Sequence, residues 1–122
     1  MTWLAVATGG AIGSLLRHSV NVVVASVVHQ PSPYATAIVN LLGSFAIGLL
    51  AGAIAGGRLQ LTPAGRTFIF VGIIGGFTTF SSFGLDTFTL AHTGRAAAAF
   101  WNVALQVGLG LAGVFAGFHL AV

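Results

Sequence analysis

The sequence predicts an all-α membrane protein in which four helices cross the bilayer. Three observations support this prediction: 57% of the 122 residues are hydrophobic, only 4% are charged, and the mean hydropathy is +1.03. A soluble domain of this length carries far more charge, because much of its surface must meet water. We therefore expect lipid to be the solvent of this surface, and a multi-pass location in the cell (plasma or inner) membrane.

Four apolar runs make up one predicted transmembrane domain, which covers residues 1–122. Each run is long enough to cross a hydrocarbon core of ~30 Å at ~1.5 Å per helical residue. The runs cover about residues 3–28, 34–55, 63–90 and 96–122.

The breaks between the runs contain residues that end or begin helices. Pro31 and Pro33 follow the first run and cannot continue its helix. The second run ends at Gly56-Gly57-Arg58, and the fourth follows His92-Thr93-Gly94-Arg95. Thr62-Pro63 has the pattern of an N-cap followed by proline at the first helical position, so a helix is predicted to begin there.

Glycines at four-residue spacing predict close packing between the helices. The spacing recurs at Gly9/Gly13, Gly48/Gly52/Gly56, Gly72/Gly76 and Gly113/Gly117. The orientation in the membrane is weakly specified, because Arg58 and Arg66 on one side oppose Arg95 on the other. Our hypothesis is that the chain inserts both ways up and pairs as an antiparallel dimer.

Composition also argues against several function classes. Cysteine is absent, so there is no thiolate nucleophile and no Cys-ligated metal site. Asp86 is the only acidic residue, and no G-x-S-x-G nucleophile motif is present, so we do not expect an enzyme. The four arginines are scattered, which does not favour nucleic-acid binding.

The third run contains Gly75-Gly76-Phe77-Thr78-Thr79-Phe80-Ser81-Ser82-Phe83-Gly84, which is poor in helix formers near the expected midplane of the membrane. This segment predicts a broken helix. Backbone polar groups at such a depth are tolerated where protein buries them or where they line an ion site.

Phe77, Phe80 and Phe83 recur every three residues and are predicted to share a face. Two interpretations are open. The rings pack, or their positive edges face a small hard anion beside the hydroxyl and amide donors of the run.

Other polar residues within the runs have two interpretations each, because a polar group in hydrocarbon usually has a partner or a function. Arg17, with His18 beside it, either snorkels toward the membrane surface or caps carbonyls of another helix, or it attracts anions to a vestibule. Asn40 is an interhelical tie or a donor to an anion. Asn102 and Gln106 lie four apart on one helical face, and they either tie helices together or form a polar track.

Three stretches resemble the CrcB/Fluc family of fluoride channels. The stretch 9–17, GGAIGSLLR, is similar to the family pattern GGxxGxxxR, and 40–45, NLLGSF, to NxxGSF. The stretch 75–83, GGFTTFSSF, is similar to GGFTTFSTF and is highly specific. The length and the four-span layout agree, and the fourth run matches more loosely through Gly110-Leu111 and Gly117.

The resemblance implies a passive fluoride channel, built as a dual-topology antiparallel homodimer with two pores, that releases fluoride from the cytoplasm. It implies that Phe80 and Phe83 contact fluoride through their ring edges, with Asn40 beside them. Ser81 would supply a vestibule hydroxyl, and Arg17 would match the arginine of the first helix.

The resemblance also implies a structural sodium ion (Na+) at the dimer centre, held by the backbone carbonyls of Gly75 and Thr78 from both subunits. The sequence departs from the family pattern at Ser82, where threonine is common. It also departs at Asn102 and Gln106, where tyrosine and serine are expected.

Two other functions compete with the channel. A small dual-topology multidrug exporter also has four short spans, but it couples to protons through a glutamate in its first helix, and this chain has no glutamate. A non-transporting membrane assembly subunit needs only the glycine-rich packing, which leaves the run of hydroxyl and phenylalanine residues unexplained.

Overall fold

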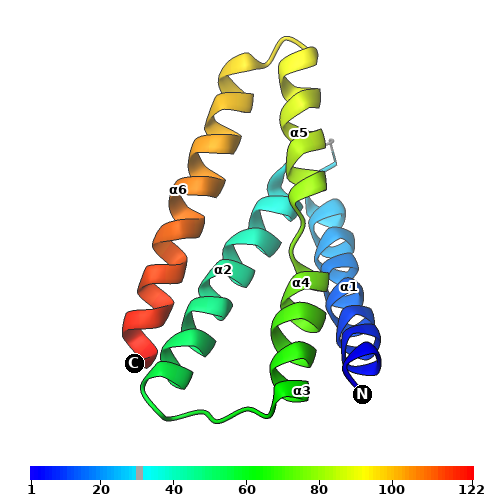
Figure 1. Cartoon of the computed structure of the whole chain (residues 1–122). Helices are drawn as coiled ribbons and strands as arrows, with labels where there is room; N and C mark the ends of the chain where they lie inside the picture. The colour runs from blue at the N-terminus through cyan, green and yellow to red at the C-terminus, as the bar shows by residue number, and fades with distance from the viewer. Residues whose placement is uncertain (30–31) are drawn as a thin grey trace.

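The computed structural model describes residues 1–29 and 32–122, and within these residues every element of secondary structure is a helix (Figure 1). The elements are α1 (Thr2–Val27), α2 (Tyr34–Ala55), α3 (Pro63–Arg66), η1 (Thr67–Ile74), α4 (Gly75–Phe77), α5 (Phe80–His92) and α6 (Ala96–Ala121). Elements α3, η1, α4 and α5 follow one another as a single span, Pro63–His92. Gln30 and Pro31, in the first predicted break, lie outside the described residues.

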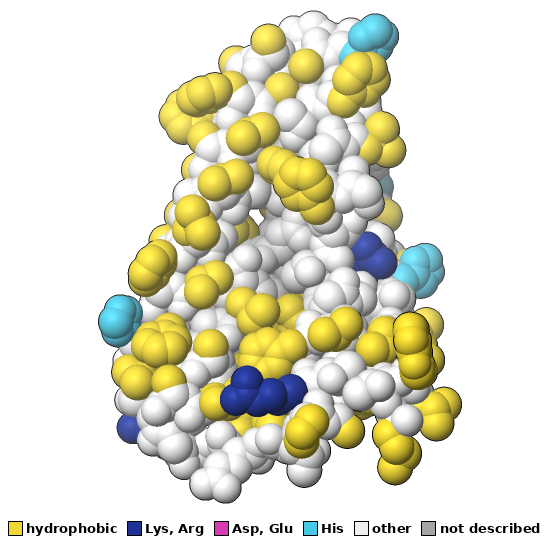
Figure 2. Space-filling model, in the orientation of Figure 1, with side chains coloured by type: hydrophobic (Ala, Val, Ile, Leu, Met, Phe, Trp, Pro, Cys, Tyr) yellow, Lys and Arg dark blue, Asp and Glu magenta, His cyan; other side chains and the backbone are white. Residues whose placement is uncertain are grey.

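Four helical spans are long and apolar enough to cross a membrane, as the sequence predicted. They are Thr2–Val27, Tyr34–Ala55, Pro63–His92 and Ala96–Ala121. The surface agrees with this assignment, because apolar side chains are spread over the face seen in Figure 2 and large ones such as Trp3 are 85% exposed. Lipid or another protein must cover such a surface. The chain is a multi-pass membrane protein.

Two helix pairs pack closely through glycine. Helix α1 lies along η1 and α4, and α2 lies along α6 (Figure 1). A methyl group added at Gly13 would overlap the carbonyl oxygen of Ile73, and one added at Gly48 would overlap that of Val114. Glycine therefore permits backbone-to-backbone contact at both interfaces, as the four-residue spacing predicted for these positions.

The turns form where the sequence placed them. Gly57 and Gly94 have φ values of 72° and 80°, a left-handed conformation that glycine adopts without steric cost. The hydroxyl oxygen of Thr62 accepts a hydrogen bond from the backbone amide of Gly65 at 3.1 Å, which confirms the predicted N-cap before Pro63. Both termini lie at one end of the molecule, and the turn between α5 and α6 lies at the other (Figure 1).

The third span is bent. Thr78 and Thr79, between α4 and α5, have extended backbones, with φ/ψ of −81°/162° and −153°/122°. Before the bend, residues Thr67–Ile74 form a π-helix, which the sequence did not predict. π-Helical turns are rare and frequently occur near functional sites.

Candidate functional site

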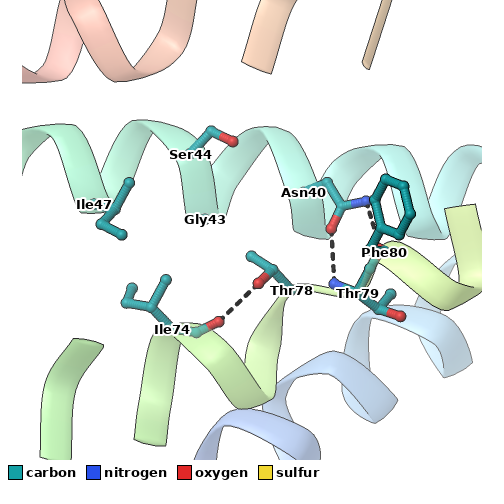
Figure 3. Close-up of a pocket in the computed structure, with 8 residues that line it drawn as sticks. All are labelled: Asn40, Gly43, Ser44, Ile47, Ile74, Thr78, Thr79 and Phe80. Atoms are coloured by element: carbon teal, nitrogen blue, oxygen red, sulfur yellow. Dashed lines mark hydrogen bonds between the residues drawn. The ribbon is translucent and has the colours of Figure 1, made fainter. Parts of the chain in front are cut away.

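The extended segment at Thr78 and Thr79 is held by Asn40 of α2. The backbone amide of Thr79 donates to Asn40 Oδ1 at 2.9 Å, and Asn40 Nδ2 donates back to the carbonyl of Thr79 at 3.0 Å (Figure 3). One side chain thus satisfies both backbone groups of a residue that has left the helix. The sequence alone left open whether Asn40 is a tie or an anion donor, and the structure shows that it ties α2 to the bend.

Side-chain hydroxyl groups form hydrogen bonds in place of the helical backbone hydrogen bonds that the bend removes. Thr79 Oγ1 accepts from the backbone amide of Ser82 at 3.2 Å and so caps α5. The same oxygen lies 3.3 Å from the hydroxyl of Ser81 and 3.2 Å from that of Ser82. The run of threonine and serine therefore forms a compact cluster of O–H groups at the start of α5.

The carbonyls of Gly75 and Thr78 lose their helical donors at the bend. In a continuous helix the amide of residue i+4 would donate to each of them. Here the amide of Thr79 donates to Asn40, and the amide of Ser82 donates to the hydroxyl of Thr79. Neither oxygen therefore accepts the amide that a continuous helix would supply, and carbonyl oxygens are ligands that suit hard cations.

A cavity of about 270 Å³ lies beside the bend, between α2 and the third span (Figure 3). Gly43 makes room for the bend, because a methyl group there would overlap Cγ2 of Thr78. The cavity is lined by Asn40, Gly43, Ser44, Ile47, Ile74, Thr78, Thr79 and Phe80.

Phe80 and Phe83 form an aromatic pair at this site. Their ring centroids are 5.5 Å apart with an interplanar angle of 46°, and the Phe80 side chain is 83% exposed. The prediction of one shared face for three phenylalanines is wrong for Phe77. That residue ends α4, and the extended residues after it interrupt the helical repeat that would align it with the other two.

Asn102 and Gln106 of α6 continue the hydrogen bonding away from Asn40. Asn40 Nδ2 donates to Gln106 Oε1 at 2.9 Å, and Gln106 Nε2 donates to Asn102 Oδ1 at 2.9 Å. Asn102 Nδ2 donates to Thr87 Oγ1 at 2.9 Å, and this hydroxyl donates to the carbonyl of Phe83 at 2.8 Å. We call this chain of five bonds, which starts at the amide of Thr79, the amide relay.

The amide relay joins Asn40 to Gln106 and Asn102, although nothing in the sequence connects Asn40 with the other two. The four-residue spacing of Asn102 and Gln106 indicated one face, but not that this face meets Asn40. Thr87 was missed, because one threonine in an apolar helix usually bonds back to its own helix, as Thr87 also does.

Not every predicted residue reaches this cluster. Arg17 lies half-buried on α1 and is not among the residues that line the cavity at the bend. The only acid, Asp86, lies on α5 with its Oδ2 buried, and within the same described residues that atom has no hydrogen-bond partner. Ser81, in contrast, belongs to the cluster through the 3.3 Å contact of its hydroxyl with Thr79 Oγ1, and it is exposed at the start of α5.

The cluster provides hydrogen-bond donors and aromatic edges in an apolar setting, with no cation among its members. Amide N–H groups, hydroxyls and ring edges all present positive charge density to a ligand. This arrangement suits a small anion that has lost water.

Sequence comparison adds an independent finding. The pattern of the family described as "CrcB-like protein, Camphor Resistance (CrcB)" matches residues 4–118. The chain belongs to this CrcB-like family. The resemblance predicted from the three motifs is confirmed.

Several similar proteins carry the name "Fluoride-specific ion channel FluC". The protein from Roseiflexus sp. (strain RS-1) is 45% identical over 121 residues, which are 99% of this chain and 97% of the relative. The protein from Elusimicrobium minutum (strain Pei191) is 45% identical over 117 residues, 95% of this chain and 90% of the relative. The protein from Rhodospirillum rubrum is 44% identical and covers 100% of this chain and 95% of its own length.

The three motifs of this CrcB-like chain meet at the bend. Gly13 of the first motif packs against Ile73 and Phe77, and Gly43 of the second packs against Thr78. Asn40, which opens the second motif, bonds to Thr79 of the third. Motifs far apart in the sequence therefore build one local structure.

Proposed function

We propose that the chain forms a fluoride-selective channel through which fluoride leaves the cytoplasm down its gradient, across the cell inner membrane, which relieves fluoride toxicity. The bonds between Asn40 and Thr79 carry this proposal, because they hold amide, hydroxyl and aromatic groups together at one bend. Family membership and the names of the relatives support fluoride as the ion.

Fluoride holds its hydration water strongly, so a narrow pore must replace that water with other donors. The ring edges of Phe80 and Phe83 and the hydroxyl of Ser81 line the pore, and Asn40 lies beside them. In this proposal the bend lies near the midplane of the bilayer and breaks the third helix there. Arg17 draws anions toward the vestibule, a role that its positive charge within the first span supports.

The conducting unit in this proposal is an antiparallel homodimer with two pores. The exposed ring of Phe80 supports it, since a pore wall must enclose that ring and a second copy can do so. The charge pattern agrees, because Arg58 and Arg66 at one end oppose only Arg95 at the other, which leaves a weak orientation signal. Cross-linking in detergent and a two-sided topology reporter at the C-terminus test the dimer and its orientations.

A structural sodium ion at the dimer centre completes the proposal. The carbonyls of Gly75 and Thr78 from two copies would hold it, and the redirected amides of Thr79 and Ser82 leave these oxygens available. When bound, the ion would neutralise carbonyl dipoles brought together at depth and so favour the extended backbone.

Liposomes test the function. Vesicles loaded with fluoride and containing the protein should release it rapidly to an external electrode without a proton gradient. A proton-coupled exporter would need that gradient, and an assembly subunit would release nothing above protein-free vesicles. Either of these results would overturn the channel proposal.

A further inference from the structure

The helix that carries Phe80 and Phe83 is held mainly from one side. After the bend, α5 packs on α6 and touches α2, and among the described residues it does not pack against α1. Figure 1 shows α5 and α6 diverging from their shared turn toward the bend. The position of the two rings therefore depends on what joins α5 to α6 along this diverging stretch.

Apolar burial anchors only the far end of α5. Leu90 is 6% exposed near the turn, and Ala99 of α6, on the other side of the turn, is also 6% exposed. Between Leu90 and the bend, no residue of α5 is buried, and the structure describes all of them. On this stretch a hydrogen bond joins the two helices, donated by Asn102 Nδ2 of α6 to Thr87 Oγ1 of α5 at 2.9 Å.

Thr87 uses its hydroxyl in two directions. The one hydrogen is donated to the carbonyl oxygen of Phe83 at 2.8 Å, one turn earlier on α5, and the oxygen accepts from Asn102. Together the two bonds fix the rotation of the hydroxyl and join the backbone of Phe83 to α6. Valine has nearly the same shape as threonine but can make neither bond.

With Thr87, the amide relay closes a ring around residues 79–83. The relay leaves the backbone at the amide of Thr79 and returns to it at the carbonyl of Phe83. Both ends of the segment that contains the Phe80–Phe83 pair are therefore tied to neighbouring helices, the first to α2 and the last to α6. The side chains that connect these two ends are Asn40, Gln106, Asn102 and Thr87.

We propose that Thr87 is a positioning residue of the channel, whose hydroxyl holds the Phe80–Phe83 pair at the spacing that discriminates fluoride from chloride. Thr87 acts through Asn102 and the backbone of Phe83 and does not touch the ion. The proposal rests on the fluoride channel proposed above and deepens it by naming what sets its selectivity. A pore excludes the larger chloride by width only while its wall is held in place, so loss of this tie should admit more chloride.

Efflux of fluoride and of chloride from matched liposomes tests the proposal. Thr87→Val removes the hydroxyl and should lower the ratio of the initial fluoride rate to the initial chloride rate by roughly five- to tenfold, the effect of one lost hydrogen bond. Thr87→Ser keeps the hydroxyl and should keep the wild-type ratio. Thr89→Val makes the same chemical change at an exposed position of α5 and should leave the ratio unchanged.

Nuclear magnetic resonance on phenylalanine-labelled protein separates positioning from loss of the fold. The chain contains ten phenylalanines, and single substitutions assign the signals of Phe80 and Phe83. Their ring centroids are 5.5 Å apart, close enough for a cross-peak between the rings. This cross-peak should weaken in Thr87→Val and remain in Thr87→Ser, with the same elution in size-exclusion chromatography. If Thr87→Val does not fold, Thr87→Ala takes its place, since it also removes the hydroxyl but leaves room for a water molecule beside Asn102.

The outcomes distinguish this proposal from the channel itself. Wild-type vesicles that release no fluoride, or release chloride as fast as fluoride, would overturn the selective channel. If the wild type is selective and the variant without the hydroxyl keeps the same ratio, the positioning role of Thr87 is wrong and the channel stands. Loss of selectivity in Thr87→Ser, or an equal loss in Thr89→Val, would also show that the hydroxyl of Thr87 is not the cause.

Discussion

Asn40 on α2 bonds to both backbone groups of Thr79 in the third span, accepting from its amide at 2.9 Å and donating to its carbonyl at 3.0 Å. The two residues are 39 positions apart in the sequence. A side-chain amide has both a donor and an acceptor on one planar group, so it can replace the two hydrogen bonds that an extended residue loses when it leaves a helix. This pairing therefore holds the bend of the third span to α2.

Asn40→Leu should therefore abolish fluoride efflux and destabilise the protein. The substitution leaves the amide of the nearly buried Thr79 without a partner, which costs about 1–3 kcal/mol. Efflux from liposomes and the thermal unfolding midpoint in detergent measure the two effects. Asn21→Leu on the exposed face of α1 is the matched control and should change neither. Full efflux from Asn40→Leu would show that the bend forms without this pairing.

Phe80→Ile and Phe83→Ile should each abolish fluoride efflux while the purified protein keeps its oligomeric state. Isoleucine retains apolar bulk but has no ring edge to face an anion. Phe100→Ile is the control, because that ring is 64% exposed on α6 and is not part of the Phe80–Phe83 pair. Efflux from liposomes and size-exclusion chromatography give the two readouts. Unchanged efflux from both variants would mean that these rings only pack.

The sequence predicted the four spans, their breaks and the bend, because each has a local signal. Apolar runs predicted the spans, and glycine and proline predicted the breaks. The ten-residue run of poor helix formers from Gly75 to Gly84 predicted that the helix breaks within it, and the structure places the extended residues at Thr78 and Thr79. The relay between Asn40 and Gln106 had no such signal. The two side chains are 66 positions apart, and their contact depends on the register in which α2 and α6 pack.

That register is set by glycine contacts that become visible only in three dimensions. A methyl group at Gly117 would overlap the carbonyl oxygen of Phe45, so α6 can approach α2 closely only at such positions. The π-helix Thr67–Ile74 was also beyond the sequence, since its apolar residues fit an α-helix equally well. Phe77 does not share a helical face with Phe80 and Phe83, because the bend lies between them. This consequence could have been predicted once a bend was expected.

Gly13→Ala should destabilise the protein, whereas Gly10→Ala should not. A methyl group at Gly13 would overlap the carbonyl oxygen of Ile73 and lie 2.8 Å from the backbone nitrogen of Phe77, so α1 must move away from the bend. A methyl group at Gly10 meets no atom within 4 Å, and alanine favours a helix over glycine by about 1 kcal/mol. Thermal unfolding midpoints in detergent should fall for Gly13→Ala and stay equal or rise for Gly10→Ala. The reverse order would contradict the packing of α1 on η1 and α4.

Removal of sodium should test the proposed ion at the dimer centre. Purification and reconstitution with N-methyl-D-glucamine as the only cation should lower fluoride efflux, and added Na+ should restore it. The reason is that the carbonyl oxygens of Gly75 and Thr78 would repel each other across the interface without a cation between them. Carbonyl sites discriminate by size and coordination, so K+ at the same concentration should restore less efflux than Na+ and serves as the control. Full efflux in the complete absence of Na+ would show that the redirected amides of Thr79 and Ser82 suffice to hold the extended backbone without an ion.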